Sequence, residues 1–411
     1  MIIEIRGDGN MTPVERFLKY VSFDTQSKED SETFPSTLKQ IELAKFLFNE
    51  LKELGVEDVK LDKYGYVYAK IPSNCMSKRT LGLIAHMDTA PDASGKDVKP
   101  SIVIFEGKDI ILENGLKLLK EDLKGKEGHK LIVTDGTTLL GADDKAGVAI
   151  IMSYVDYIIH TDIKHPNIIV CFTPDEEVGG GTDHFDVKWY LESAADAYTY
   201  TVDGGDIKEI SYETFNAASC KIIIHGKSIH PGSAKDKMVN AQLVAIEFIN
   251  KLPSKERPEH TEMYEGFYHL TSLKGDVTLT EAHYIIRDHD RGLFESRKAR
   301  MQEIAKEINE KYGEGTIEII IEDSYYNMKE KVAEKMELVD VVKSSMVENG
   351  ITPIEMPIRG GTDGARLSFE GIPCPNLGTG GENFHGPLEY LDINDFLKMI
   401  EVIKTLSKSL I

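Results

Sequence analysis

The chain has 411 residues, of which 41% are hydrophobic and 28% charged, and its formal net charge at pH 7 is −21. This length exceeds what one compact core usually organises, so two domains are expected. The negative charge argues against nucleic acid or an anionic membrane as a partner, since both need basic patches, and no run approaches the roughly 20 apolar residues that span a bilayer.

The first two predicted elements are helices. Thr12 and Glu15 have the spacing of a capping box, and Pro13 stands at the first helical position. Apolar residues at helical spacing over residues 38–54 predict a second, amphipathic helix.

Strand patterns follow, each closed by polar residues. The segments YVYAKI, TLGLIAH, NIIVCFTPDEE and AYTYTVDGG are typical of strands, and a helix is predicted from about 144 to 159 between two of them. Residues 100–131 are expected to form an inserted hairpin or flap. The alternation of strands and helices predicts an α/β fold, with a mainly parallel sheet that carries helices on both faces.

The pattern changes at residue 212. A strand over 212–225, a helix ending near Pro253, the strands YEGFYHLTSLKG and EAHYIIRDHD, a charged helix over 292–312 and the strand TIEIIIED give the order β-α-β-β-α-β. This is the split-βαβ (ferredoxin-like) plan, with two helices on one sheet face. Helices at 332–347 and 393–409 then return to the first pattern. We therefore expect a discontinuous domain (1–211 and 325–411), interrupted by a smaller α+β domain (212–324).

The cysteines and the opening residues bear on the compartment. Cys75, Cys171, Cys220 and Cys374 show no close pairing in the sequence, and the opening MIIEIRGDGN has no secretory pattern. Free thiols in the cytoplasm are the expectation. Either Met1 or Met11 is a candidate start, because a helix start follows Met11 at once.

Seven polar residues stand where predicted strands end. They are His86, Asp88, Asp143, Glu176, Glu177, Asp203 and His385. Taken singly, each is more typical of a cap, a turn or a structural hydrogen bond. Taken together, two histidines and several carboxylates suit a pair of zinc-like ions, and adjacent glutamates allow one to bind metal while the other moves protons. The set predicts a two-metal hydrolase.

A family resemblance rests on strings in a fixed order. HMDT, LLGADDKAG, FTPDEEVG, YTVDGG, IHPG, EGFYHL, IEDSYYNM, IRGGTDGARLSF and TGGENFHG occur between about residue 12 and the C-terminus. The chain resembles the peptidase T family of tripeptide aminopeptidases. That family belongs to the superfamily of dinuclear zinc peptidases that also holds aminoacylase and carboxypeptidase G.

The resemblance implies two Zn²⁺ ions per chain, with Co²⁺ or Mn²⁺ able to substitute. His86 and Asp203 would hold one ion, Glu177 and His385 the other, and Asp143 would bridge both. Ions so placed lower the pKa of a shared water.

Two further carboxylates would act beside the metals. Glu176 would take the proton from the attacking water and pass it to the leaving amine. Asp88 would accept a hydrogen bond from the imidazole of His86 and fix its tautomer.

The smaller domain would serve, by the same resemblance, as a lid and dimerisation domain. His230 would stabilise the carbonyl oxygen, from either subunit of a homodimer, and Arg287 would grip the peptide's C-terminal carboxylate. Asn240, Asn216 and Arg359 are weaker candidates for substrate contacts. The alternatives are structural: a helix-start residue for His230, and an ion pair with a neighbouring aspartate for Arg287.

The resemblance implies a metallo-aminopeptidase that removes the N-terminal residue from tripeptides. A related dinuclear dipeptidase, carboxypeptidase or N-acyl-amino-acid deacylase is the main alternative. A binding protein without catalysis and a two-metal phosphoesterase stay open as alternatives from other classes.

Overall fold

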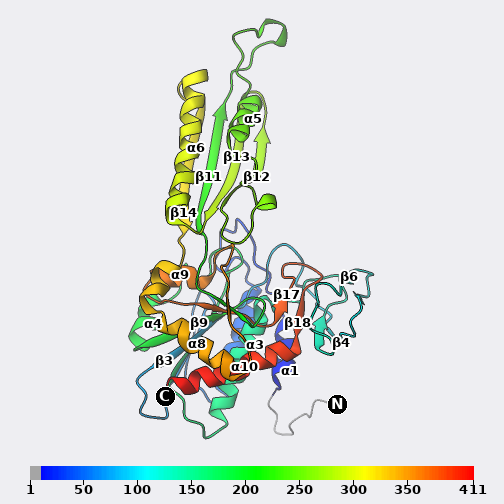
Figure 1. Ribbon diagram of the computed structural model, residues 1–411, viewed down its shortest axis with the longest axis vertical. Coiled ribbons are helices and arrows are strands. Elements are labelled where there is room, and N and C mark those ends of the chain that lie inside the picture. The colour runs from blue at the N-terminus through cyan, green and yellow to red at the C-terminus, as the bar shows by residue number, and fades with distance from the viewer. Residues whose placement is uncertain (1–10) are drawn as a thin grey trace. The chain divides into compact units, whose positions relative to one another are not determined.

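The computed structural model describes residues 11–411, so the expectations that rest on residues 1–10 lie outside the described part. The chain forms two compact units (Figure 1). The first runs to Tyr212 and resumes at Glu330–Met356 and Thr362–Ile411. The second comprises Glu213–Lys329 and Pro357–Gly361, so the chain passes between the units four times.

The main sheet of the first unit has eight strands. In spatial order they are β1 (Asp58–Leu61), β2 (Val67–Ile71), β8 (Asn167–Thr173), β3 (Thr80–His86), β9 (Ala197–Val202), β16 (Asn376–Leu377), β10 (Glu209–Ser211) and β15 (Ile354–Glu355). The central strands β8, β3, β9 and β16 run parallel, while β1, β2 and β10 pair antiparallel to neighbours.

Helices pack on both faces of this sheet, as predicted. Those of the first unit are α1 (Pro13–Val21), α2 (Gln40–Glu53), α3 (Ala142–Ile159), α4 (Val187–Ser193), α7 (Lys329–Val332), α8 (Glu337–Glu348), α9 (Asp363–Phe369) and α10 (Ile393–Ser409), with a 3₁₀ turn at Ala333–Lys335. The predicted capping box opens α1. Helix α3 contacts β3, β9, α1 and α10, whereas residues of α4 and α9 share a core cluster with Ile84, Ile169 and Cys171 of the sheet.

A small second sheet contains the expected insertion. Its order is β17 (Gly381–Glu382), β18 (Tyr390–Asp392), β7 (Lys130–Val133) and β4 (Ser101–Ile104), and β5 (Ile110–Ile111) pairs with β6 (Lys117–Leu118) beside it. Leu118, Leu131 and Tyr390 are among the buried side chains of its own core. Because β18 pairs with β7, the insertion is joined to the segment that carries His385.

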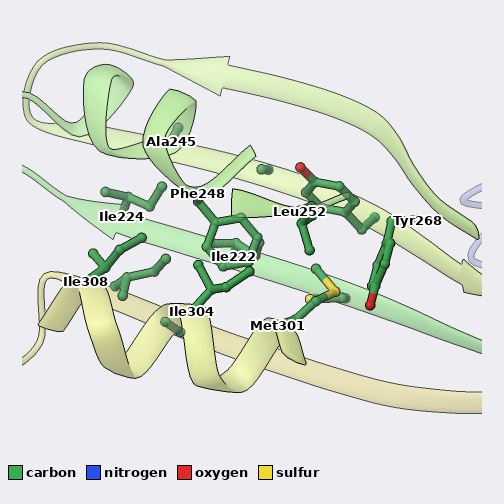
Figure 2. Close-up of a cluster of buried hydrophobic side chains, with 14 of the residues drawn as sticks. Ile222, Ile224, Ala245, Phe248, Leu252, Tyr268, Met301, Ile304 and Ile308 are labelled. Carbon is green, nitrogen blue, oxygen red and sulfur yellow. The ribbon is translucent and has the colours of Figure 1, made fainter. Parts of the chain in front are cut away.

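The second unit has the split-βαβ order that its sequence predicts. Its antiparallel sheet is β12 (Phe267–Gly275), β13 (Leu279–Asp288), β11 (Asn216–His225) and β14 (Ile317–Tyr325), with α5 (Ala241–Lys251) and α6 (Arg291–Tyr312), and 3₁₀ turns at Pro231–Ser233 and Pro258–His260. Alternate residues of β11 point into the core. Figure 2 shows Ile222 and Ile224 meeting Phe248 of α5 and Ile304 of α6, so both helices cover one sheet face.

The structure differs from expectation in three places. The helix predicted over 332–347 is interrupted by the 3₁₀ turn. The seven-residue α9 lies in a glycine-containing segment where no helix was predicted. Residues 325–329 and 357–361 group with the second unit, since Ile358 donates a backbone hydrogen bond to Glu213 (2.8 Å) and Gly360 accepts one from Phe215 (3.3 Å). Among the helices of residues 11–411, none is long and apolar enough to cross a membrane.

Candidate metal centre

Three neighbouring parallel strands end at one edge of the main sheet. His86 is the last residue of β3, Asp203 follows β9, and Glu176 and Glu177 follow β8. Strands β8 and β9 flank β3 on either side. Parallel strands bring their carboxyl ends together, and this is where ligands gather in such sheets.

Asp143 completes two groups of ligand atoms at this edge. His86, Asp143 and Asp203 form one group, and Asp143, Glu177 and His385 form the other. In each group the candidate atoms lie within 4.8 Å of one another. The structure therefore brings together all five residues predicted as metal ligands, with Asp143 as the one that both groups share.

The distances place Asp143 between the two imidazoles. His86 Nε2 lies 2.9 Å from Asp143 Oδ1 and 3.9 Å from Asp203 Oδ1. His385 Nε2 lies 3.5 Å from Asp143 Oδ2 and 3.0 Å from Glu177 Oε2. One carboxylate thus presents one oxygen to each histidine, which is the arrangement that a bridging ligand needs.

Asp88 supports both the histidine and the glutamate pair. Its Oδ1 lies 3.3 Å from His86 Nδ1, and its main-chain carbonyl oxygen lies 3.1 Å from the same nitrogen. The same carboxylate accepts the backbone N–H groups of Glu176 (3.0 Å) and Glu177 (3.2 Å). Asp88 therefore orients the imidazole and also fixes the turn that presents both glutamates.

The electrostatics of these residues suit a divalent cation. Burial and the Asp143 charge raise the pKa of Asp203 to about 8, and the same two causes raise that of Glu177 to about 7. Hydrogen bonds to Asp143 and Glu177 raise the pKa of His385 to about 11. The buried Glu177 Oε1 has no hydrogen-bond partner within residues 11–411. Crowded carboxylates and an orphaned oxygen are relieved when a cation neutralises them, so the donor set fits a metal pair.

Glu176 differs from its neighbour in that its carboxylate is free. It makes no hydrogen bond or ion pair inside the described part of the chain, and it belongs to neither ligand group. Its pKa is raised well above the ordinary value by burial and by the charges of Asp203 and Asp363. A carboxyl group of this kind, beside metal ligands, is suited to proton transfer.

Asp363 is a site residue that sequence reasoning missed. It stands in the first turn of α9, is 5% exposed, and its Oδ2 accepts a hydrogen bond from Thr173 Oγ1 (2.6 Å). Burial raises its pKa to about 6, and its charge in turn raises the pKa of Glu176 and Asp203. The string GGTDG was visible in the sequence, but one aspartate before a short helix reads as a cap.

Asp175, which directly precedes Glu176 and Glu177, was also missed, because only the two glutamates were considered as site residues. It adopts φ of 58° and its buried carboxylate accepts the Ser36 backbone N–H (2.5 Å) and Gln40 Nε2 (2.6 Å). These bonds hold the turn between β8 and the two glutamates against the segment that leads into α2.

His230 and Arg287 lie on the second unit. His230 is exposed, and its Nδ1 accepts the backbone N–H of Gly232 (3.2 Å), which leaves Nε2 pointing away from that bond. Arg287 Nη1 donates to the backbone oxygens of Ile286 (3.0 Å) and Ala218 (3.4 Å), its guanidinium lies 5.5 Å from the ring centre of Tyr325, and burial lowers its pKa. Within residues 11–411 Arg287 has no ion pair, so the expected alternative of a pair with a neighbouring aspartate is absent there.

The three weaker substrate candidates have structural partners in the same unit. Asn240 Oδ1 caps α5, and Asn216 Nδ2 donates to the backbone oxygens of Asp288 (3.0 Å) and His289 (3.1 Å). Arg359 donates to the backbone oxygens of Met263 (2.7 Å), Glu265 (3.0 Å) and Thr261 (3.3 Å) and to Thr261 Oγ1 (2.9 Å). These hydrogen bonds within the protein explain the positions of the three side chains, and no substrate contact is needed to explain them.

The chain has close relatives among known proteins. It is 54% identical over 400 residues to a peptidase T of Clostridium perfringens, which covers 96% of this chain and 98% of the relative. The chain belongs to the peptidase T family. A peptidase T of Alkaliphilus oremlandii is 51% identical over 400 residues, covering 95% of this chain and 97% of that one.

Solved structures share the fold of this chain. An aminopeptidase PepT from Bacillus cereus superposes with a TM-score of 0.75 at 26% identity, covering 97% of this chain and 98% of that one. A tripeptidase from Staphylococcus aureus gives a TM-score of 0.77 at 23% identity and shares the fold over 97% of each chain. A Bacillus subtilis protein described as a dinuclear metal-binding peptidase has the same fold at 14% identity and a TM-score of 0.64, covering 95% of this chain and 96% of that one. Residues 212–316 match the model of a peptidase dimerisation domain.

Proposed function

We propose that this peptidase T is a two-metal aminopeptidase that removes the N-terminal residue from tripeptides. Family membership supports the reaction class. The observation that carries the two-metal part is the position of Asp143, which belongs to both ligand groups and offers a separate oxygen to each.

The metals in this proposal are two zinc ions, replaceable by Co²⁺ or Mn²⁺. His86 and Asp203 would hold the first, Glu177 and His385 would hold the second, and Asp143, which both ligand groups share, would contribute to both. Imidazole nitrogens combined with carboxylate oxygens are donors that zinc accepts readily.

The chain's own residues then divide the remaining work. When bound, the metal pair supplies Lewis-acid polarisation of the scissile carbonyl and a water of lowered pKa. Glu176, whose carboxylate is free, takes a proton from the attacking water and delivers it to the leaving amine. Asp88 keeps the His86 tautomer fixed and holds the backbone of Glu176 and Glu177 in place.

The substrate assignments are His230 for the carbonyl oxygen and Arg287 for the C-terminal carboxylate. Arg287 suits this role because its guanidinium has no acidic partner inside the described residues. Asn240 caps α5 and Arg359 donates to the backbone oxygen of Met263, so neither is assigned a substrate contact. Both stay in the proposal as residues that shape the second unit, which carries His230 and Arg287.

The proposal extends to assembly and compartment. A homodimer is supported by the match of residues 212–316 to a dimerisation domain. A location in the cytoplasm is supported by the four cysteines, all of which are free thiols, because disulfides are rare in that reducing compartment.

The first test is digestion of trialanine by the zinc-loaded protein, followed by mass spectrometry. Dialanine, tetra-alanine and N-acetyl-trialanine run in parallel. We expect alanine and dialanine from the tripeptide alone, and a fall in kcat of about 10³-fold in Glu176→Gln with both metals retained. Cleavage of dialanine or the acetylated peptide instead would favour the dipeptidase or deacylase alternative, and inertness towards all four would sink the proposal.

The carboxylate assignment has its own test. Trialanine and trialanine amide are compared as substrates of the wild type and of Arg287→Met. We expect the wild type to prefer the free acid, and the variant to lose that preference through a KM for trialanine raised about 10-fold or more. An unchanged preference in a folded variant would remove Arg287 from the substrate site.

A further inference from the structure

The loop that carries Asp143 is held by one buried carboxylate. Glu389 lies between His385 and β18 and is 2% exposed. Its Oε2 accepts the backbone N–H groups of Leu140 (2.7 Å) and Gly141 (2.8 Å), and its Oε1 accepts that of Asp143 itself (3.0 Å). One side chain thus binds three of the four residues from 140 to 143.

The loop has few other means of holding this shape. Gly141 precedes α3 with φ of 84° and has no side chain with which to cap the helix. Asp143 (φ −86°, ψ 107°) and Asp144 (φ −120°, ψ 34°) depart from helical geometry, so the regular helix begins after them. N–H groups at a helix start lack internal acceptors and need external ones. Glu389 supplies these acceptors, although it lies 246 to 249 positions further along the chain than the donors.

The charge of Glu389 is not explained by an ion pair. Lys145 is buried nearby, but its Nζ donates to the backbone oxygen of Phe23 (2.8 Å). Inside residues 11–411, Glu389 has only the three N–H donors of the 140–143 loop as side-chain partners. A buried carboxylate is costly, so a position that merely filled space would favour an apolar side chain.

We propose that Glu389 is a positioning residue of the metal centre, for the loop that carries Asp143. It fixes the backbone of residues 140–143, and thereby aims the Asp143 carboxylate between the two histidines. It also joins the Asp143 loop to the segment of His385, four residues before it. The inference rests on the proposed function, because Asp143 affects both sites only if it bridges two metals.

The test compares Glu389→Gln with a matched control. Glutamine keeps the size but replaces one acceptor oxygen with an NH₂ group that faces N–H donors. Asp392→Asn is the control. Asp392 is equally buried and three residues away, but its partners are Lys126, His129 and the start of α10. Zn²⁺ affinity is measured on the full chain by competition with a chromogenic chelator, beside the visible spectrum of the Co²⁺ form and amide hydrogen exchange of the metal-free protein.

We expect Glu389→Gln to weaken both zinc-binding steps by about 10- to 100-fold, to change the Co²⁺ spectrum and to speed exchange at residues 140–143. Asp392→Asn should lower Tm while leaving zinc affinity and the spectrum unchanged. Glu389→Asp, which keeps the charge but shortens the reach, should behave like Glu389→Gln and serves if that variant does not fold.

The outcomes separate the two ideas. A wild type that binds no metal would overturn the proposed function. A wild type that binds two ions, with both Glu389 variants at wild-type affinity, would overturn the positioning role alone. Equal losses of affinity in the Glu389 and Asp392 variants would make Glu389 a general fold contact and would also overturn it.

Discussion

Two clusters in the first unit offer the same kinds of ligand but differ in what neutralises them. One is the group of His86, Asp143 and Asp203, and the other contains His129, Asp392 and Asp395. Each gathers one histidine and two carboxylates at a spacing that a metal ion could use.

The second cluster already contains a cation. The ammonium of Lys126 lies 3.1 Å from Asp395 and 3.4 Å from Asp392 and Glu382. Burial alone would lower the pKa of Lys126, but the charges of these three carboxylates outweigh burial and raise that pKa. In the first cluster the ion pairs of Asp143 and Asp203, within residues 11–411, are with histidines only. Ligand type therefore does not distinguish a metal site from a structural ion cluster, and the resident lysine does.

The largest effect should come from removing the shared ligand. We expect Asp143→Asn to lose both metals and to reduce kcat/KM for trialanine by about 10³-fold or more, because neither group keeps its full donor set. Metal content measured by plasma mass spectrometry decides this. Asp395→Asn, in the lysine-filled cluster, should keep two ions per chain. One ion retained at full occupancy in Asp143→Asn would show that this carboxylate does not bridge.

A second effect should appear in the pH dependence of the metal-free protein. The folded-state pKa is about 8 for Asp203 and about 7 for Glu177, both above their unfolded values near 4. The folded state then binds more protons than the unfolded state. The stability that these protons confer is full below pH 4 and is lost as pH rises through 7 and 8.

We therefore expect the free energy of unfolding of the chelated protein to fall by several kcal/mol between pH 5 and 8. The raised pKa of His385, about 11, acts in the same direction over this range. The zinc-loaded protein should show the opposite slope, because metal binding needs deprotonated ligands. Parallel urea titrations of the two forms give both slopes, and equal slopes would contradict the electrostatic account of the site.

The smallest effect should follow from emptying the second cluster of its lysine. Lys126→Met should destabilise the fold by about 2 kcal/mol, because three carboxylates lose their partner. Millimolar Mn²⁺ should then restore part of the loss in Lys126→Met and have no effect at this cluster in the wild type. Thermal unfolding with and without Mn²⁺ measures this. A folded Lys126→Met protein that gains no stability from Mn²⁺ would contradict the comparison of the two clusters.

The substitution His129→Ala, in the same cluster, should lower the free energy of unfolding by less than about 1 kcal/mol.

The sequence was sufficient to predict the site residues that directly follow strands. His86, Glu177 and Asp203 follow apolar runs whose direction in a parallel sheet is predictable, and their convergence follows from the fold. Asp143 and His385 were singled out in the same way, although in the structure Asp143 stands at the start of α3 and His385 in the turn between β17 and β18. The split-βαβ order of the second unit was also legible, because its strands alternate and its helices are long.

What escaped prediction depends on tertiary hydrogen bonds. Glu389 is a single acid in a loop and Asp363 a single acid at the start of α9. Only the folded chain shows that Glu389 binds three N–H groups and that Asp363 binds Thr173. The partners of Arg359 are carbonyl oxygens almost 100 positions away, so no local pattern marks them. A seven-residue helix such as α9 carries too few apolar positions for a period to be recognised.

The discontinuity of the first unit has a consequence for synthesis on the ribosome. His86 and Asp143 emerge early, but His385 lies 242 positions after Asp143, so the second ligand group is incomplete until the second unit has been made. Glu389, which braces the Asp143 loop, emerges later still. A chain that stops before residue 385 consequently lacks His385 and with it the second ligand group.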